Sequence, residues 1–165
     1  MALDEINQYP ITATQIGENS FIDIDQYISP GVWESQKVPK SVLLELNPVN
    51  IQVACSDETT DLAVTASVLT FRMPHAMTLT EVRASVTTAP TGDVITVGVN
   101  QNGGALLSTK VTIDATEKTS TTAVTPPFIS VSALTDDAEI TVDIDGIGST
   151  IAGTGLKITL IGTRA

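Results

Sequence analysis

Short alternating runs of apolar and polar residues recur about every ten residues from residue 68 onward, with turn formers between them. A period of two places successive side chains on opposite faces of a strand, so each run predicts a strand with one buried face. The predicted strands are Val68–Met73, Met77–Val86, Val94–Gln101, Leu106–Ile113, Phe128–Val131, Glu139–Ile144 and Leu156–Thr163, with a further candidate first strand at Ile51–Ala54.

One of these runs changes phase along its length. In Met77–Val86, Leu79 has one phase and Val82 has the other. A single extra residue reverses the facing of everything after it, so we expect a β-bulge near Glu81.

Turn formers mark where the predicted strands end. Pro90–Asp93 is expected to form a turn, and Asn102-Gly103 supplies the pair that tolerates positive φ in a tight hairpin. The pair Pro126-Pro127 has no N–H to donate, so it belongs at a sheet edge or outside a ladder.

The first fifty residues are built differently. Phe21–Tyr27 alternates like a strand, and Val32–Val38 is expected to return beside it after a turn. Lys40–Leu46, bounded by prolines, is compatible with one or two helical turns, and Met1–Asn19 is expected to be an extended arm. A unit this small cannot bury its own core, so we expect it to pack on a partner chain or on the rest of the protein.

Together these patterns predict a mainly β chain in two parts. Residues 51–165 are expected to form an antiparallel two-sheet β-sandwich, jelly-roll-like, with seven to nine strands. Residues 1–50 are expected to form an N-terminal arm and an anchoring module made of a hairpin and a helical turn. The 25 threonines support the β assignment, because a β-branched side chain fits a pleated sheet better than a helix.

The charge balance narrows the possible partners. The chain of 165 residues carries 19 acidic and 8 basic side chains, a formal net charge of −11, and the basic residues are scattered. Binding to a polyanion requires clustered cations, so no nucleic-acid partner is expected. The start lacks the features of a signal peptide, and no run approaches the roughly 20 apolar residues of a membrane helix, so no membrane association is expected either.

The residue inventory leaves few candidates for chemistry. With one cysteine and one histidine, a disulfide framework, a thiolate zinc cluster and a multi-histidine metal site are excluded, and no cofactor is predicted. His75 lies in a predicted bend and is interpreted as a surface or interface histidine rather than a catalytic base. Cys55 follows an apolar strand and is interpreted as a small buried hydrophobe. We therefore expect no enzymatic activity.

A group of carboxylates near residue 140 admits a calcium or glycosidase interpretation. Asp143 and Asp145 stand two residues apart before Gly146, but the further ligands of a calcium loop are missing. A glycosidase would need a groove of aromatic residues. In an alternating strand, these acids form the solvent face, and that is the interpretation we favour.

Aromatic residues gather near the start of the chain. Four of the six lie in the first fifty positions, where amphipathic rings are candidates for anchoring to a protein interface. Packing inside the hairpin module is an equal alternative. These candidate interface residues are Tyr9, Phe21, Tyr27 and Trp33.

Several blocks in order from Leu69 to Arg164 resemble a β module that recurs in structural proteins of tailed bacteriophages. The main blocks are Phe71–Pro74, Met77–Ala84, Thr88–Gly92, Leu107–Lys110, Ile113–Ser120, Asp136–Asp145 and Gly155–Arg164. Phe21–Leu46 also resembles, more loosely, a small module found upstream of such domains in phage fibre and appendage proteins.

The resemblance implies a non-enzymatic virion protein displayed on the particle surface, often a homotrimer, with no catalytic residue carried over. We expect a capsid decoration (cement) or head-fibre protein bound to the major capsid protein or another virion protein, made in the host bacterial cytoplasm. The alternatives are a tail-fibre or spike receptor-binding protein, and a carbohydrate-binding jelly-roll module that recognises a host surface glycan.

Overall fold

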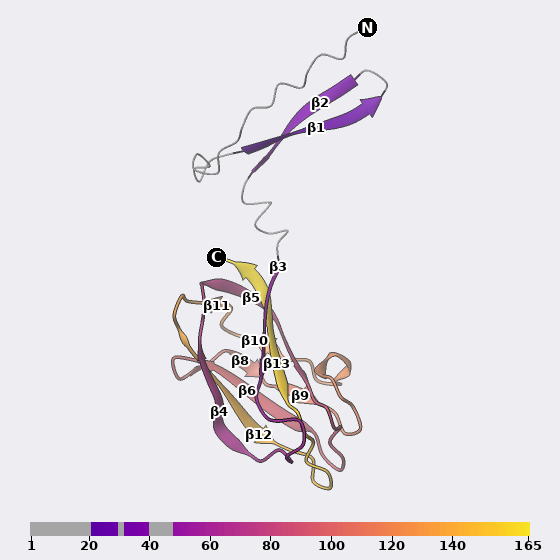
Figure 1. Ribbon diagram of the computed structural model, residues 1–165, viewed down its shortest axis with the longest axis vertical. Coiled ribbons are helices and arrows are strands. Elements are labelled where there is room, and N and C mark those ends of the chain that lie inside the picture. Colours follow the sequence, from indigo (N-terminus) through magenta and orange to yellow (C-terminus); the bar gives the residue numbers. More distant parts are fainter. Residues whose placement is uncertain (1–20, 30–31, 40–47) are drawn as a thin grey trace. The chain divides into compact units, whose positions relative to one another are not determined.

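The computed structural model describes residues 21–29, 32–39 and 48–165. The chain divides into two units, Met1–Leu46 and Asn47–Ala165, which are described separately (Figure 1). The described residues contain no helix long and apolar enough to cross a membrane.

In the first unit, the predicted hairpin is confirmed. Strand β1 (Phe21–Ser29) pairs antiparallel with β2 (Val32–Pro39), and the register places Tyr27 opposite Trp33. The predicted arm and the predicted helical turns lie outside the described residues, at 1–19 and 40–46.

The second unit, here called the β domain, is built from antiparallel strands. One sheet has the order β11-β5-β13-β3, and the other has the order β4-β12-β6-β7 with β9 also paired to β6. Strands β8 and β10 form a separate pair. The strands are β3 (Pro48–Ala54), β4 (Thr65–Arg72), β5 (Met77–Ser85), β6 (Ile95–Gln101), β7 (Gly104–Ala105), β8 (Leu107–Thr109), β9 (Val111–Ile113), β10 (Phe128–Ile129), β11 (Ala133–Leu134), β12 (Glu139–Gly146) and β13 (Lys157–Arg164).

Both large sheets contribute to one apolar core, an arrangement compatible with a β-sandwich. Ile140 and Val142 of β12, and Ile158 and Leu160 of β13, are fully buried, as the alternation predicts. Each such side chain contributes about 1.5–3 kcal/mol relative to an exposed one. The prediction of a mainly β chain with antiparallel sheets is confirmed.

The predicted bulge in β5 is also confirmed. Glu81 pairs with Ile161, but the next pair joins Leu79 to Gly162, so Thr80 is the extra residue. The buried positions of β5 change phase across this point, as the sequence indicates.

The hairpin at Asn102-Gly103 is confirmed as well. Both residues have positive φ, 49° and 81°, and Gln101 pairs with Gly104 across the turn. Such a pair gives the turn a twist that matches the flanking strands.

The strand predicted over Leu106–Ile113 is instead divided into two short strands, β8 and β9, and Leu106 belongs to neither. Leu106 and Leu107 are adjacent and both buried, which a flat strand with alternating faces does not allow. The chain therefore leaves β6 after β7, pairs through β8 with β10, and returns to β6 as β9.

Two predicted boundaries also shift. The β domain starts before residue 51, because β3 begins at Pro48 and pairs with β13 from there. Strand β10 ends at Ile129, short of the predicted Val131, where the backbone N–H groups of Ser130 and Val131 both donate to the Leu106 carbonyl.

The two ends of the β domain differ in what they carry. The chain enters at Pro48, which pairs with Thr163 near the end of the chain. Three loops, 55–64, 86–94 and 147–156, gather at the opposite end, because Ala54 and Ser85 both pair with Lys157 there (Figure 1). We call these three segments the distal loops.

Candidate functional site

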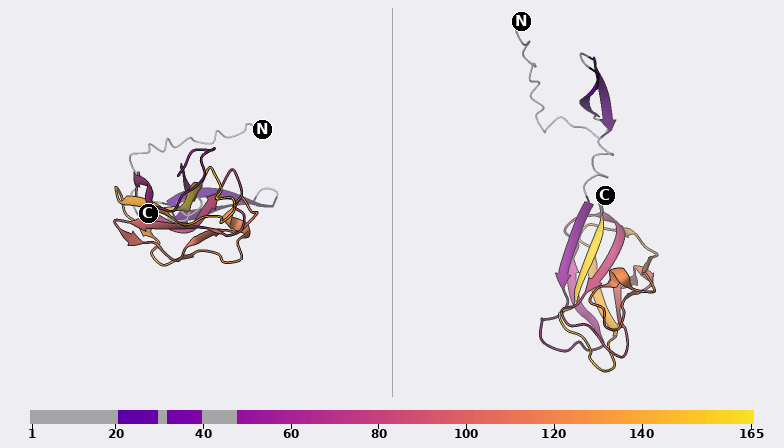
Figure 2. Two further views of the ribbon diagram at one scale, coloured as in Figure 1. Left: turned by 90° about the horizontal axis from the view of Figure 1, so that it is seen from below. Right: turned by 90° about the vertical axis from the view of Figure 1, so that its right-hand side faces the viewer.

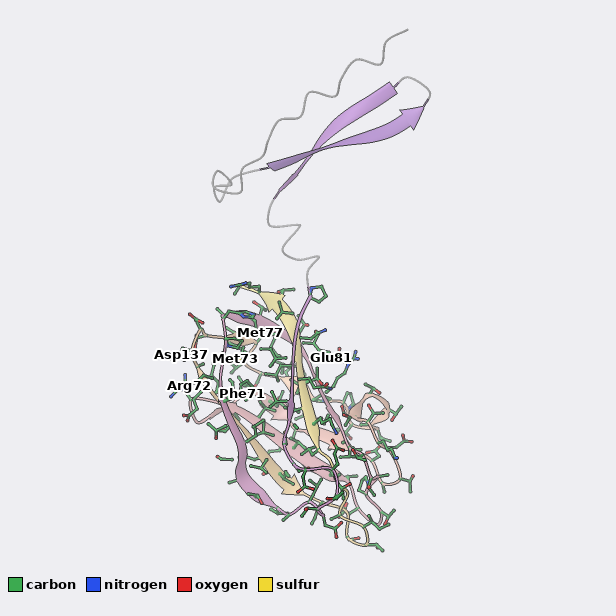
Figure 3. The ribbon with its side chains drawn as sticks, in the orientation of Figure 1. Phe71, Arg72, Met73, Met77, Glu81 and Asp137 are labelled. Carbon is green, nitrogen blue, oxygen red and sulfur yellow. The ribbon has the colours of Figure 1, made fainter. Side chains whose placement is uncertain are left out.

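Two of the blocks that carry the family resemblance, Phe71–Pro74 and Asp136–Asp145, meet at the entry end of the β domain. Arg72 of β4 pairs with Glu139 of β12, and its Nη2 lies 3.5 Å from the Glu139 carboxylate. Its Nη1 donates to the Asp137 carbonyl at 3.1 Å (Figure 3). The Met73 N–H donates to the Ala138 carbonyl at 2.9 Å, and Met73 itself is buried. These residues close one end of the core, which is a structural role.

His75 lies in the bend between β4 and β5, as predicted. Its side chain is half-buried rather than at the surface, and Nε2 is enclosed without a hydrogen-bond partner. The bend is tied to the end of the chain, because the Ala165 N–H donates to the Ala76 carbonyl at 3.2 Å. A general base needs a nucleophile within hydrogen-bond reach. The described residues place none beside Nε2.

Cys55 is buried at the end of β3, as its apolar surroundings in the sequence predict. Burial raises the pKa of its thiol to about 11. The nucleophilic form is the thiolate, which this environment disfavours. The thiol is therefore in a structural rather than a reactive position.

The carboxylates of β12 lie on its outer face, which agrees with the favoured interpretation. Asp143 is half-buried and accepts hydrogen bonds from the Ser67 N–H at 2.6 Å and from Asn100 Nδ2 at 2.7 Å. Asp145 is exposed and pairs with Lys110 at 2.8 Å. Each carboxylate thus has partners of its own. Among the described residues, no group of three or more His, Cys, Asp or Glu side chains is placed to hold a metal ion.

The predicted interface aromatics fall in the first unit. Phe21, Tyr27 and Trp33 lie on β1 and β2, where the structure describes the backbone and its register alone. Tyr9 lies outside the described residues. Their anchoring role stays a prediction.

A hollow beside β5 was not anticipated. On this edge of β5, the ladder with β11 ends at Thr78, and pairing resumes at Ser85 with a single bridge to Thr119. Between these points, one wall of the hollow is the stretch Thr80–Arg83. The other wall comes from the 3-10 turn η2 (Ser120–Thr122) and the segment leading into β10, and the volume is about 330 Å³. The residues of this second wall are Ser120, Thr121, Pro126, Pro127, Phe128 and Ile129.

An ion pair and an aromatic ring stand out in this hollow. Arg83 donates from Nε and Nη2 to the two carboxylate oxygens of Glu81, at 2.6 and 2.8 Å. These hydrogen bonds and the Glu81 charge raise the pKa of Arg83. Phe128 is 64% exposed, although it is one of only two aromatic residues after residue 50.

A second hollow of about 330 Å³ continues over the outer face of the sheet and shares Arg83 and Thr121 with the first. It is lined mainly by amides and hydroxyls, and Gln52 donates to Thr159 Oγ1 within it at 3.1 Å. Figure 2 shows β3, β13 and β5 side by side, with η2 next to β5. We call the two hollows together the β5 groove. The further residues of the second hollow are Asn50, Ala84, Ser85, Thr119 and Ile161.

The distal loops are held by polar contacts. Asp57 Oδ1 accepts the backbone N–H groups of Thr60 at 2.7 Å and Thr59 at 2.8 Å, which lower the pKa of Asp57 to about 2. Lys157 pairs with Glu58 at 2.6 Å. These contacts fix the loop backbone and provide a defined polar surface at this end.

The β5 groove and the distal loops are both surfaces whose chemistry suits noncovalent binding of a ligand. Sequence reasoning missed the groove because its walls lie about 40 residues apart in the chain, and the available signal was Phe128 directly after two prolines. In the comparison with known proteins, no family model, no curated protein and no solved structure matches the chain.

Proposed function

We propose that the protein is a non-enzymatic structural component of a tailed-bacteriophage virion, displayed on the particle surface as a capsid decoration or head-fibre protein. The ordered sequence blocks between Leu69 and Arg164 support this proposal, and so does the mainly β architecture. In finer detail, we propose a jelly-roll-like connection of the sheets and assembly as a homotrimer.

The observation that carries the proposal is the separation of the two ends of the β domain. The chain enters beside the terminal strand at Pro48, and the distal loops lie at the other end. A domain tethered at its entry end presents the opposite end outward, where loops on a rigid scaffold are the usual binding surface. The proposed tether is the N-terminal unit, with Tyr9, Phe21, Tyr27 and Trp33 as candidate contacts to the major capsid protein or another virion protein.

The environments of the candidate reactive groups support a structural role. Cys55 is buried with a raised pKa, and Asp143 is engaged by Ser67 and Asn100. The outer surface is acidic, since twelve acidic and six basic side chains follow residue 50. A net charge of −6 favours the solubility of a densely displayed domain.

Electron microscopy of virions labelled with an antibody against the β domain tests the proposal. Label on the head is expected, and label on the tail would favour the tail-fibre or spike alternative. Virions of the encoding phage that carry no label anywhere would refute a displayed virion protein.

A deletion variant that begins at Asn47 tests the tether. The full chain is expected to be a trimer by light scattering and to bind particles stripped of it, whereas the variant should not bind. A circular dichroism spectrum of unchanged β character would show that the variant is folded. A monomeric full chain, together with undiminished binding of the variant, would contradict the proposal.

A further inference from the structure

The exposed ring of Phe128 is not accounted for by folding. The ring is 64% exposed, whereas Phe71, the other aromatic residue of the β domain, is half-buried against the core. The backbone of Phe128 is held by its pairing with Thr109 in the short β8–β10 ladder. Pro126 and Pro127 precede it and restrict the chain, because their φ angles are fixed. The structure thus holds a flat apolar surface at the rim of the β5 groove.

The floor of the groove offers hydrogen-bonding groups in fixed positions. The ion pair with Glu81 uses two of the five N–H donors of Arg83, and those two bonds orient the guanidinium. Thr80 donates to the Ile161 carbonyl at 3.1 Å, which fixes its hydroxyl and leaves the hydroxyl oxygen able to accept a further hydrogen bond. Side chains ordered before binding lose little entropy when a ligand arrives.

The other half of the groove is richer in neutral polar groups. Gln52 and Thr159 are bonded to each other, and the Thr119 and Thr121 hydroxyls lie 3.0 Å apart. Amides and hydroxyls that both donate and accept match the hydroxyl groups of a sugar. The volume of each half is at the lower end of the roughly 300–1,000 Å³ range of ligand pockets.

Charge selects among the possible ligands. Within the groove, Arg83 and Glu81 neutralise each other, and the remaining lining residues are uncharged. The β domain as a whole has an excess of acidic residues, which repels anions. The groove therefore fits a neutral ligand better than a sulfated, phosphorylated or sialylated one.

The edge of β5 is poorly suited to a peptide that would add as a new strand. The open stretch carries the bulge at Thr80 and two charged side chains, Glu81 and Arg83. Bulges and charges are the features with which natural sheets prevent strand addition at an edge. A ligand that bonds through hydroxyls does not need a regular ladder.

We propose that the β5 groove binds a neutral oligosaccharide, with the Phe128 ring stacked on the apolar face of one sugar and the polar side chains around Arg83 bonded to hydroxyls of the next. The proposal concerns a site distinct from the proposed tether. It does not depend on the virion assignment, because it can be tested on the purified full chain.

The test is binding of the full chain to an array of neutral oligosaccharides of four to eight hexose or N-acetylhexosamine units, printed beside sulfated and sialylated versions of each. Binding to at least one neutral oligomer is expected, with weaker binding to its anionic versions. Phe128→Ala should raise the dissociation constant about tenfold or more, because it removes the stacking of the ring on the sugar. Arg83→Lys should also raise the dissociation constant, because lysine lacks the planar fork of the guanidinium.

Val124→Ala is the matched control, since Val124 is 89% exposed near the groove but does not line it. Both Phe128→Ala and the control should melt close to the unchanged protein, because neither side chain is in the core. The proposal would be overturned if the full chain bound no neutral oligomer or preferred the anionic ones. It would also be overturned if Phe128→Ala bound as tightly as the unchanged protein. Binding of an alternating Thr-Val hexapeptide at this edge in place of the sugar would overturn it as well.

Discussion

Replacing Gly162 with alanine tests how tightly the two central strands of one sheet are joined. Gly162 of β13 pairs with Leu79 beside the bulge of β5. An alanine Cβ there would overlap the Thr78 carbonyl oxygen, and it would lie 2.9 Å from the carbonyl carbon and 2.6 Å from Met77 Cε. The methionine tip can move, but the Thr78 backbone can move only if β5 separates from β13.

The expected cost follows from that separation. Overpacking a close contact costs about 1–3 kcal/mol. Weakening one backbone hydrogen bond of the ladder adds about 0.5–1.5 kcal/mol. A total loss of about 2–4 kcal/mol should lower the melting temperature by about 10 °C, given that each kcal/mol corresponds to several degrees in a domain of this size.

Thermal unfolding followed by far-ultraviolet circular dichroism measures this loss. Gly104→Ala is the control, because the nearest atom to a Cβ at Gly104 is the Gln101 carbonyl oxygen at 3.4 Å, an ordinary contact. The control should melt within about 3 °C of the unchanged protein. If Gly162→Ala melts no lower than Gly104→Ala, the close approach of β5 and β13 beside the bulge is wrong.

Two further predictions concern titrating groups. The pKa of Cys55 is raised from 9.0 to about 11. At pH 8, iodoacetamide should therefore alkylate the folded protein about 100-fold more slowly than a free cysteine, because the thiolate is the reactive form. Equal alkylation rates would contradict a buried thiol. The pKa of Asp57 is lowered from 3.8 to about 2 by the Thr60 and Thr59 N–H groups, so its stabilisation is complete above pH 3.8 and is lost as the pH falls through 2. Asp57→Ala should therefore have a lower melting temperature than the unchanged protein at pH 7, and this difference should shrink toward pH 2. Asp57→Asn is the control, because its side-chain oxygen can still accept the two N–H groups. A difference in melting temperature between Asp57→Ala and the unchanged protein that does not change with pH would contradict this account.

The alternation of apolar and polar residues correctly predicted the central strands, which are paired with another strand along both edges. Ile140, Val142, Ile158 and Leu160 are buried as expected, because a central strand has one face on the core along its whole length. The bulge near Glu81 was also readable, since a change of phase within one run has few other causes.

The segment from Leu106 to Ile129 was predicted less well. Leu106 and Leu107 are consecutive and both buried, and this requires the chain to change partners between β7 and β9. The partner, β10, is only two residues long and carries no alternation of its own. Pairing of such short strands depends on contacts distant in sequence, which a local pattern does not contain.

The β5 groove was missed for the same reason. In the sequence, Thr80, Glu81 and Arg83 have the pattern of ordinary outward-facing strand positions, and the turn at Ser120–Thr122 has no helical period. What joins them is a buried hydrogen bond from the Ala84 N–H to Ser120 Oγ at 2.9 Å. A serine among threonines gives no sign in the sequence that it will be the one to bond to β5.

The antiparallel pairing of β3 with β13 gives the β domain a mechanical direction. The two strands are joined by seven register pairs, from Pro48 opposite Thr163 to Ala54 opposite Lys157. A pull on Pro48 directed away from the distal loops acts along β3 and loads all seven pairs at once, so the strands must slide past each other as a unit. A pull that draws Pro48 and Thr163 apart opens the same pairs one after another. The ladder therefore resists tension along the axis of the domain and unzips under tension between its two chain ends.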